Sequence, residues 1–363
     1  MNHTTLLLKR IPVAITFLFI IFCRPELAAQ DTDQDANKVS PALPITDIYL
    51  LDISLDKKGK LQFQNPALIT KNENYDDQPW WYPDGSGILY ASVHDSSARD
   101  SSKADIYKYD MRSQKTSVVI NTPRTAEYSP MIPPNKIGIS VVQVLEDDTT
   151  QFLCRCDNAT DECTSLLPKQ KKVAYYVWID ASRVAFVVLS DPWMLLMANL
   201  TTGKIDTLAE DVGRCLQKVP GKNLQIAFVD KVSNPWTIKT YDGKGGKISG
   251  VVPTLEEQED FCYMPDGSLL MGSGSQLFRY VPPMATPTTA HGAPVTSKNA
   301  PSNSKNTPSK PEKPKEEKGK KKDHGPWEMV ADFKNTPLYQ FYRLAASPKG
   351  DKLAIVTYLD EKP

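Results

Sequence analysis

The chain has 363 residues, of which 40% are hydrophobic, and its 43 Lys and Arg residues equal its 43 Asp and Glu residues in number. This length allows a large core within one repeat-built domain. The balanced charge excludes a global field that would draw the chain to nucleic acid, so we expect no nucleic-acid partner.

The first 29 residues resemble a secretory signal peptide. They combine a basic pair at Lys9-Arg10, an apolar run at 11–22 and a small-residue cleavage site at 27–29. This order is typical of a leader, and the apolar run is short for a membrane span. We predict a signal peptide at 1–29, an exported protein in the periplasm or outside the cell, and no transmembrane segment after cleavage. An uncleaved anchor or a lipidated Cys23 is the alternative.

A polar tail, 30–45, precedes a region in which two patterns recur about every 45 residues, the length of a four-stranded unit. The first pattern is an aromatic-rich strand, a turn and an apolar strand, and it occurs at 79–91, 128–141, 175–188, 215–229, 261–273 and 343–357. The second is a hairpin, which follows the first five of these at 105–120, 151–167, 192–208, 235–252 and 276–333. Period-2 alternation and Pro, Asp and Gly turns favour strands throughout.

The hairpin missing from the last unit lies at the start of the region. Residues 46–70 repeat the Asp-Ile-Tyr of the hairpin at 105–120, so the chain begins with the outer half of a unit and ends with the inner half. Joined, these halves complete a sixth unit and remove the exposed sheet edges. We predict an all-β, six-bladed β-propeller of four-stranded antiparallel blades over 46–363, closed by N-terminal outer strands pairing with C-terminal inner strands.

The turns carry a family resemblance. The stretch PWWYPDGSGILYAS at 79–92, followed by DIYKYD at 105–110, resembles the repeat of the TolB-like six-bladed β-propellers. The turn residues that match are Pro83, Asp84 and Gly85, then Pro265, Asp266 and Gly267, and more loosely Pro348 and Gly350. The resemblance implies a propeller and an envelope location, but TolB has an α/β domain before its propeller, and only the propeller pattern is found in this sequence. Because function resides in sites grafted onto folds, the resemblance indicates the fold more than the activity.

Five cysteines follow the predicted leader. Cys156 and Cys163 flank a hairpin turn, so they face each other on paired strands, and we expect a disulfide between them. Burial as two small hydrophobic side chains is the alternative. Cys215 and Cys262 lie at similar places on the inner strands of adjacent blades, and we consider a second bridge there.

Residues 284–326 interrupt the pattern. They are rich in Pro, Ser, Thr and Lys and contain almost no large apolar side chain. Such a segment buries too little surface to offset its ordering entropy, so we predict a disordered insertion at a hairpin tip. Its Lys-rich end is a solvated loop or a contact for a polyanion.

The sequence contains no motif for catalysis. It lacks a nucleophile elbow, a phosphate-binding glycine loop and a metal-ligand spacing. We therefore expect no catalytic residues, no metal and no cofactor.

A binding surface remains, formed by the loops that lead into the innermost strands together with those strands. Aromatic and Arg side chains are frequent there, and these types dominate binding hot spots. The candidate residues are Tyr75, Trp80, Tyr128, Tyr175, Tyr176, Arg214, Phe261, Tyr339, Tyr342 and Arg343. We predict a monomeric, non-catalytic scaffold that binds another envelope protein or a peptide segment. The alternative is a glycan-binding or carbohydrate-active propeller that uses these aromatics with the acidic loop Glu256–Asp260.

Overall fold

The structure is a computed structural model that describes residues 43–70, 74–94, 103–283 and 324–359. The predicted leader, residues 30–42 of the predicted tail and 284–323 of the predicted insertion lie outside the described residues. The described part contains 24 strands and no helix. Accordingly, none of its segments is a helix long and apolar enough to cross a membrane.

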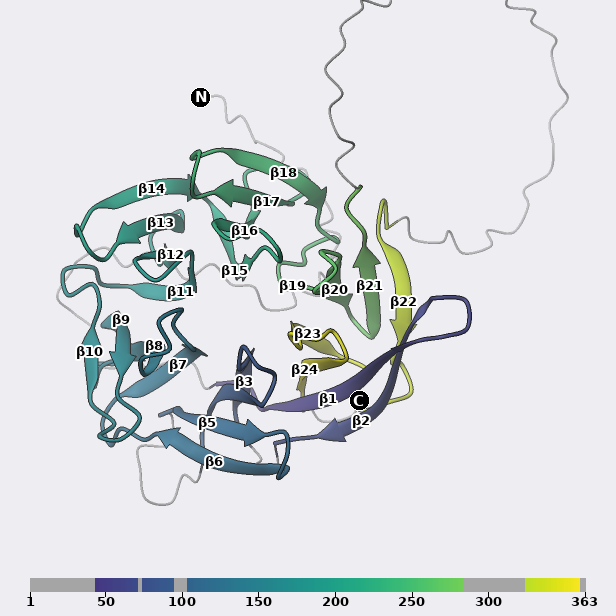
Figure 1. The fold of residues 1–363 in the computed structure, drawn as a ribbon, viewed down its shortest axis with the longest axis horizontal. Helices are drawn as coiled ribbons and strands as arrows, with labels where there is room; N and C mark the ends of the chain where they lie inside the picture. The colour runs from purple at the N-terminus through teal and green to yellow at the C-terminus, as the bar shows by residue number, and fades with distance from the viewer. Residues whose placement is uncertain (1–42, 71–73, 95–102, 284–323, 360–363) are drawn as a thin grey trace, which may run out of the picture. The chain divides into compact units, whose positions relative to one another are not determined.

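The strands form six antiparallel sheets of four strands each, arranged in a ring (Figure 1). The predicted six-bladed propeller is therefore confirmed. Blade 1 closes the ring, and its strands are β1 (Thr46–Leu55), β2 (Leu61–Leu68), β23 (Phe341–Ala346) and β24 (Lys352–Tyr358).

The other five blades follow one another along the chain. Blade 2 consists of β3 (Asp76–Trp81), β4 (Gly87–Ser92), β5 (Asp105–Asp110) and β6 (Lys115–Ile120). Blade 3 consists of β7 (Ala126–Met131), β8 (Ile139–Val144), β9 (Gln151–Cys156) and β10 (Cys163–Ser165). Blade 4 consists of β11 (Val173–Trp178), β12 (Arg183–Val188), β13 (Met194–Asn199) and β14 (Ile205–Glu210).

Blades 5 and 6 complete the series. Blade 5 consists of β15 (Val212–Lys218), β16 (Gln225–Asp230), β17 (Thr237–Asp242) and β18 (Ile248–Pro253). Blade 6 consists of β19 (Phe261–Tyr263), β20 (Leu269–Ser273), β21 (Gln276–Tyr280) and β22 (Glu328–Asp332). In each of blades 2 to 6 the first strand is innermost and the fourth is outermost.

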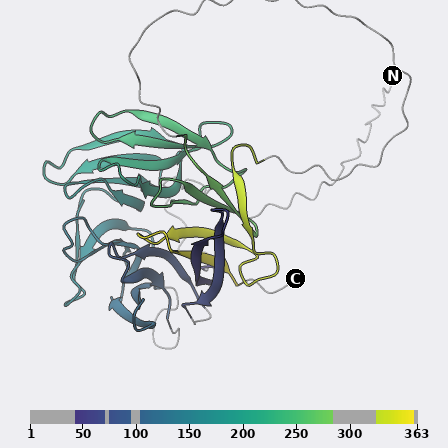
Figure 2. The same cartoon turned by 45° about the vertical axis from the view of Figure 1, so that its right-hand side comes forward.

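The two ends of the propeller meet in blade 1, as predicted. Its strand order is β2-β1-β24-β23, and β1 pairs with β24 from Thr46 opposite Tyr358 to Asp52 opposite Lys352. The purple N-terminal strand lies beside the yellow C-terminal strands in both views (Figure 1; Figure 2). Main-chain hydrogen bonds of an ordinary antiparallel ladder thus close the ring.

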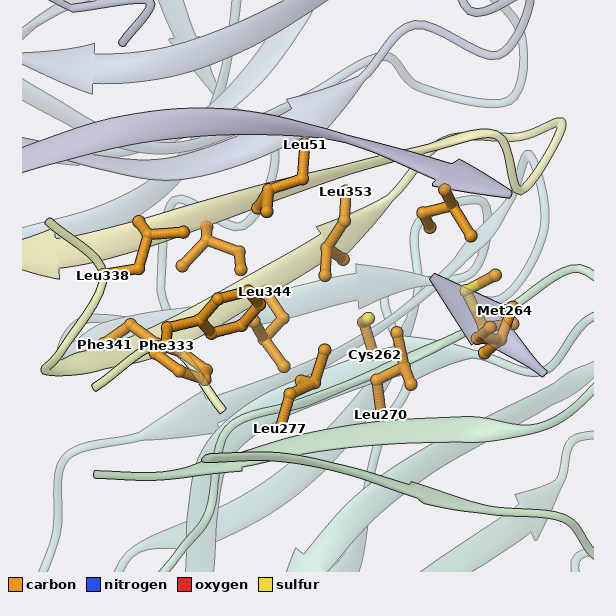
Figure 3. Packing of buried hydrophobic residues seen from close by; sticks show 13 residues of the cluster. Leu51, Cys262, Met264, Leu270, Leu277, Phe333, Leu338, Phe341, Leu344 and Leu353 are labelled. Atoms are coloured by element: carbon orange, nitrogen blue, oxygen red, sulfur yellow. The ribbon is translucent and has the colours of Figure 1, made fainter. Parts of the chain in front are cut away.

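The core is divided among the interfaces between blades. Six clusters of buried apolar side chains are present in the described residues, one between each pair of neighbouring blades. This division arises because alternate residues of a strand point to opposite faces, and each blade buries both faces against its neighbours. Figure 3 shows the cluster between blades 6 and 1, where Leu277 and Leu270 meet Leu344 and Leu353.

The predicted turn residues lie between the first and second strands of three blades. Gly85, Gly267 and Gly350 have positive φ values of 75°, 85° and 72°. Glycine adopts this conformation without steric cost, and each amide donates to the carbonyl three residues earlier, at 2.8 to 2.9 Å. These turns all lie at the same end of the innermost strands, and we call that side of the ring the turn face. The opposite side, with the loops that lead into those strands, is the loop face.

The two cysteine pairs differ. Cys156 and Cys163 lie directly opposite each other on β9 and β10 and are joined by a disulfide. Cys215 and Cys262 are free, so the second bridge that we considered is absent. The reason is side-chain alternation on β19: the Cys215 thiol meets the backbone of Phe261, whereas Cys262 points into the cluster between blades 6 and 1 (Figure 3).

Candidate binding cavity

The innermost strands of all six blades line one cavity at the centre of the ring. Its volume is about 550 Å³, and it is lined by residues of β3, β7, β11, β15, β19 and β23. Each of these strands pairs on one side only, so its other edge faces the channel. Proline is tolerated on such an edge because no ladder hydrogen bond is lost there, which accounts for Pro79 and Pro130 in the wall.

Two β-bulges shape the wall formed by blades 2 and 3. The register of β3 shifts between Asp77 and Trp80, and that of β7 shifts between Tyr128 and Met131. Gln78 and Ser129, the residues before the two prolines, have positive φ values of 60° and 51°. The Gln78 side-chain oxygen accepts a hydrogen bond from the Ser129 amide, which ties the two bulges together. Bulges redirect side chains at sheet edges, and here they occur beside the cavity.

A network of two arginines and two aspartates lies near the beginning of the innermost strands, at the loop-face end of the cavity. Arg343 of blade 1 donates through Nη1 to Asp77 Oδ2 of blade 2 at 2.7 Å. Arg214 of blade 5 donates through Nε to Asp260 Oδ2 at 3.1 Å and through Nη2 to the same atom. The Nε atom of Arg343 is 3.8 Å from Asp260 Oδ1, so the two pairs are joined. We call these four residues the charged floor.

The two aspartates of the charged floor are buried, the two arginines are half-buried, and the four charges interact strongly. Burial raises the pKa of the Asp260 carboxyl, but Arg214 and Arg343 lower it more, and it ends below its ordinary value. Burial lowers the pKa of Arg343, yet Asp77 and Asp260 raise it above the usual range. Asp260, Arg214 and Arg343 therefore remain ionised over the physiological pH range, held by their opposite charges.

Aromatic rings surround the charged floor. Both guanidinium groups lie over the ring of Tyr342, at 5.4 Å for Arg214 and 5.7 Å for Arg343. The Tyr75 hydroxyl donates to Asp77 Oδ2 at 3.1 Å. Burial raises the pKa of Tyr75 well above its ordinary value, so this phenol keeps its proton and remains a donor.

The wall and mouth of the cavity extend from the charged floor to the turn face. The mouth is formed by turn prolines from four blades, namely Pro83, Pro220, Pro265 and Pro348. Lys218, at the end of β15, also lines the cavity and donates through Nζ to the carbonyls of Ile179 and Asn223. Burial lowers the pKa of this ammonium group. The cavity thus has apolar walls, a proline-rich mouth with Lys218 beside it, and the charged floor at the opposite end.

Six of the ten candidate residues line this cavity. They are Trp80, Tyr175, Tyr176, Arg214, Phe261 and Arg343. Tyr75 and Tyr342 lie against the charged floor instead. Tyr128 packs edge-on against Tyr75, with ring centroids 6.1 Å apart, and half-buried Tyr339 precedes β23 in the loop that leads into it.

The sequence reasoning did not find the turn-face part of the cavity. The predicted site consists of aromatics and arginines near the loop face and leaves out Lys218, Gln217 and the mouth prolines. The recurring proline in the first turns, at Pro83, Pro265 and Pro348, was noted as a fold marker only. Since turns of one kind gather on one face of a propeller, these prolines were also the signal for the mouth.

Part of the acidic loop Glu256–Asp260 is occupied by ion pairs. Asp260 belongs to the charged floor, and Glu259 Oε2 accepts from Lys231 Nζ at 2.8 Å. The Nζ atom of Lys231 also lies 4.5 Å from the centre of the Trp236 ring. In the described residues, no group of three His, Cys, Asp or Glu side chains is arranged to hold a metal ion.

The comparisons with known proteins concern the fold. No protein-family model matches the chain, and a search of curated proteins finds no match by sequence. Among solved structures, a protein provisionally named TolB from Agrobacterium tumefaciens has a TM-score of 0.55 at 11% identity, over 88% of this chain and 100% of that one. TolB from Acinetobacter baumannii has a TM-score of 0.49 at 14% identity. The match covers 65% of this chain and 61% of the Acinetobacter protein, so this chain spans less than two thirds of that protein's length.

An oligogalacturonate lyase from Vibrio parahaemolyticus matches with a TM-score of 0.47 at 9% identity, over 84% of this chain and 82% of that one. At these identities the likeness concerns the fold alone. The chain has the fold of the TolB-like six-bladed propellers, as its turns predict.

Proposed function

We propose that this protein is an exported, non-catalytic scaffold that binds an extended peptide segment of a partner protein in the central cavity. The observation that carries this proposal is the cavity itself, whose volume of about 550 Å³ falls in the range of ligand pockets. Its walls combine apolar side chains with a few fixed polar groups, the composition that such pockets share. The unpaired edges of the innermost strands offer main-chain hydrogen bonds to an extended chain.

The chemistry of the cavity supports binding rather than covalent catalysis. Burial raises the pKa values of the Cys215 and Cys262 thiols in its wall to about 12. A thiol with so high a pKa remains protonated and is a poor nucleophile. Arg214 and Arg343 hold the pKa of the Asp260 carboxyl below its ordinary value, and a carboxylate that stays ionised suits a fixed recognition element better than a proton shuttle.

The disulfide supports the proposed location. Disulfides persist in oxidising compartments such as the periplasm and the cell exterior, and Cys156–Cys163 is one. A partner in the same compartment, an envelope protein with an exposed extended segment, fits both this location and the cavity. The protein needs no second copy to complete the cavity, so we propose that it acts as a monomer.

A selection of displayed random peptides on the purified protein tests this function. We expect enriched peptides that bind the wild type, lose binding to Gln217→Trp, which fills the cavity, and retain binding to Ile248→Trp on the exposed outermost strand of blade 5. Peptides that bind both variants equally would place recognition outside the cavity. Failure to enrich any peptide would count against the function itself.

A second candidate function, glycan binding, has one observation in its favour. A surface pocket between blades 5 and 6, of about 650 Å³, is lined by Trp236, Trp327, Asn234, Glu256 and Glu257. Trp327 is buried, but the half-buried indole of Trp236 beside carboxylate and amide groups suits a saccharide, whose faces are apolar and whose edges carry hydroxyls. A glycan array decides: sugar binding that Trp236→Ala abolishes supports this function, and an array without signal removes it.

A further inference from the structure

The charged floor keeps hydrogen-bond donors that its own carboxylates do not use. Arg214 donates to Asp260 through Nε and Nη2, and Arg343 donates to Asp77 through Nη1. Among the residues that the structure describes, Arg214 Nη1 and Arg343 Nη2 donate to no acceptor. The Arg214 side chain keeps 27% of its area exposed and that of Arg343 keeps 16%, so solvent and a ligand can reach both groups. A guanidinium carries five donor hydrogens, and these unused ones belong to residues that line the cavity.

The carboxylates of the floor, in contrast, are occupied. Asp77 accepts from Arg343, from the Tyr75 hydroxyl and from the amide of Gln78. Asp260 accepts from Arg214 through both of its oxygens. At this end of the cavity the carboxylate oxygens are therefore already hydrogen-bonded, while guanidinium N–H groups are still available to a ligand.

The charge of the cavity lining also favours an anionic ligand. Three basic side chains line the cavity, those of Arg214, Lys218 and Arg343; the two arginines pair with Asp260 and Asp77, so Lys218 carries the surplus positive charge. In the described structure Lys218 donates to two main-chain carbonyls and forms no ion pair. A low-dielectric wall strengthens the interaction of such a lining with an anion.

We propose that the cavity recognises a carboxylate at the leading end of the bound peptide, held by Arg214 Nη1 and Arg343 Nη2. This inference rests on the proposed function and adds the chemistry of the ligand. The carboxylate is either an acidic side chain or the chain terminus, since both present the same pair of oxygens. Two guanidinium groups are suited to it because their planar donors match a carboxylate geometrically.

The apolar part of the cavity indicates which side chains the rest of the bound peptide carries. Pro130, Ile132 and Leu216 are among the wall residues, and the turn prolines form the mouth. An extended segment that enters from the turn face would place apolar residues against this wall and its carboxylate on the charged floor. The ligand class is therefore an acidic-ended, otherwise apolar peptide.

Matched peptide libraries test the proposal on the full propeller. The probes are N-acetylated hexapeptides in which one position at a time is Asp, Glu, Asn or Gln, each made with a free C-terminal carboxylate and with a carboxamide. After affinity selection on the immobilised protein, we expect enrichment of carboxylate-bearing peptides, and at least tenfold weaker binding of the amide isostere of the best peptide. Loss of binding on amidation identifies the chain terminus as the source, and loss on Asp→Asn or Glu→Gln identifies a side chain.

A charge change in the wall provides the matched control. Gln217 lines the cavity but lies outside the charged floor, so its substitution leaves the ion pairs intact. Gln217→Glu should weaken the acidic peptide about tenfold more than its amide isostere, and Gln217→Lys should have the opposite effect. Peptides that bind regardless of charge would overturn this inference and leave the proposed function standing. If no peptide binds, whether it carries a carboxylate or an amide, both this inference and the proposed function fail.

Discussion

Gly272→Ala tests the contact by which blade 6 meets the closing blade. Gly272 lies on β20, and a Cβ atom added there would come within 2.5 Å of Cε2 in the ring of Phe341, on β23. The Gly272 backbone is not in the left-handed region, so alanine itself fits the strand. The nearest obstacle is the Phe341 ring from the far end of the chain, which is fixed in the cluster of Figure 3.

The expected cost follows from overpacking. Real Cβ atoms essentially never approach a neighbour so closely, and Phe341 is buried against Phe333 with ring centroids 5.8 Å apart, which limits its escape. Inserting a methyl group into such a site costs about 1–3 kcal/mol of the free energy of unfolding. For a domain of this size we expect the melting temperature to fall by about 2–5 °C.

Urea and thermal unfolding, followed by circular dichroism, measure the effect. Gly250→Ala is the matched control, because its Cβ would meet only Thr237 Cγ2 at an ordinary 4.0 Å. A double variant, Gly272→Ala with Phe341→Leu, should be more stable than the sum of its single changes by at least about 0.5 kcal/mol. If Gly272→Ala is as stable as Gly250→Ala, or if the two changes at the seam are additive, the predicted packing of blade 6 on blade 1 is refuted.

Three further changes test other parts of the structure. Trp81→Phe removes the hydrogen bond from Nε1 to the Ala345 carbonyl, which spans the interface of blades 2 and 1 at 2.9 Å; it should cost about 1–3 kcal/mol in urea unfolding, and an unchanged midpoint would contradict that bond. Replacing Cys156 and Cys163 together by Ser should cost about 2 kcal/mol, and a reductant should destabilise the wild type but not this variant; equal responses would contradict the disulfide. Burial raises the pKa of Glu127, so its contribution to stability is present at low pH and is lost as pH rises through the folded-state pKa. Glu127→Gln, which cannot ionise, should therefore gain stability relative to the wild type between pH 4 and pH 8, and a constant difference would show that the buried carboxyl does not titrate in this way.

The fold was predictable because its signals are local and repeated. Tight turns such as Pro83 to Gly85 and alternating apolar strands recur often enough to count blades from sequence. The ring closure was predictable because one hairpin was missing at one end and present at the other. The disulfide between Cys156 and Cys163 was predictable because its signal is also local: a short hairpin places the residues on its two sides opposite each other.

The cavity was only partly predictable because it depends on which way each side chain of an innermost strand points. Bulges at Gln78 and Ser129 shift that alternation, and positive φ values at non-glycine residues leave no pattern in the sequence. The ion pairs of the charged floor join blades 1, 2, 5 and 6, so spacing along the chain does not indicate them. The same limitation explains the bridge between Cys215 and Cys262 that the structure lacks: similar strand positions on adjacent blades do not imply facing thiols.

Site-specific photo-crosslinking tests the central claim, that a partner segment occupies the cavity. The photoreactive residue p-benzoylphenylalanine would replace Gln217 in the cavity wall or, as a control, Ile248 on the exposed outermost strand of blade 5. The proteins would be produced in cells that make the native protein, irradiated and analysed for covalent adducts by mass spectrometry. We predict a single defined adduct from position 217, to an extended segment of the partner, and none from position 248. No adduct from position 217, or the same adduct from both positions, would contradict the claim.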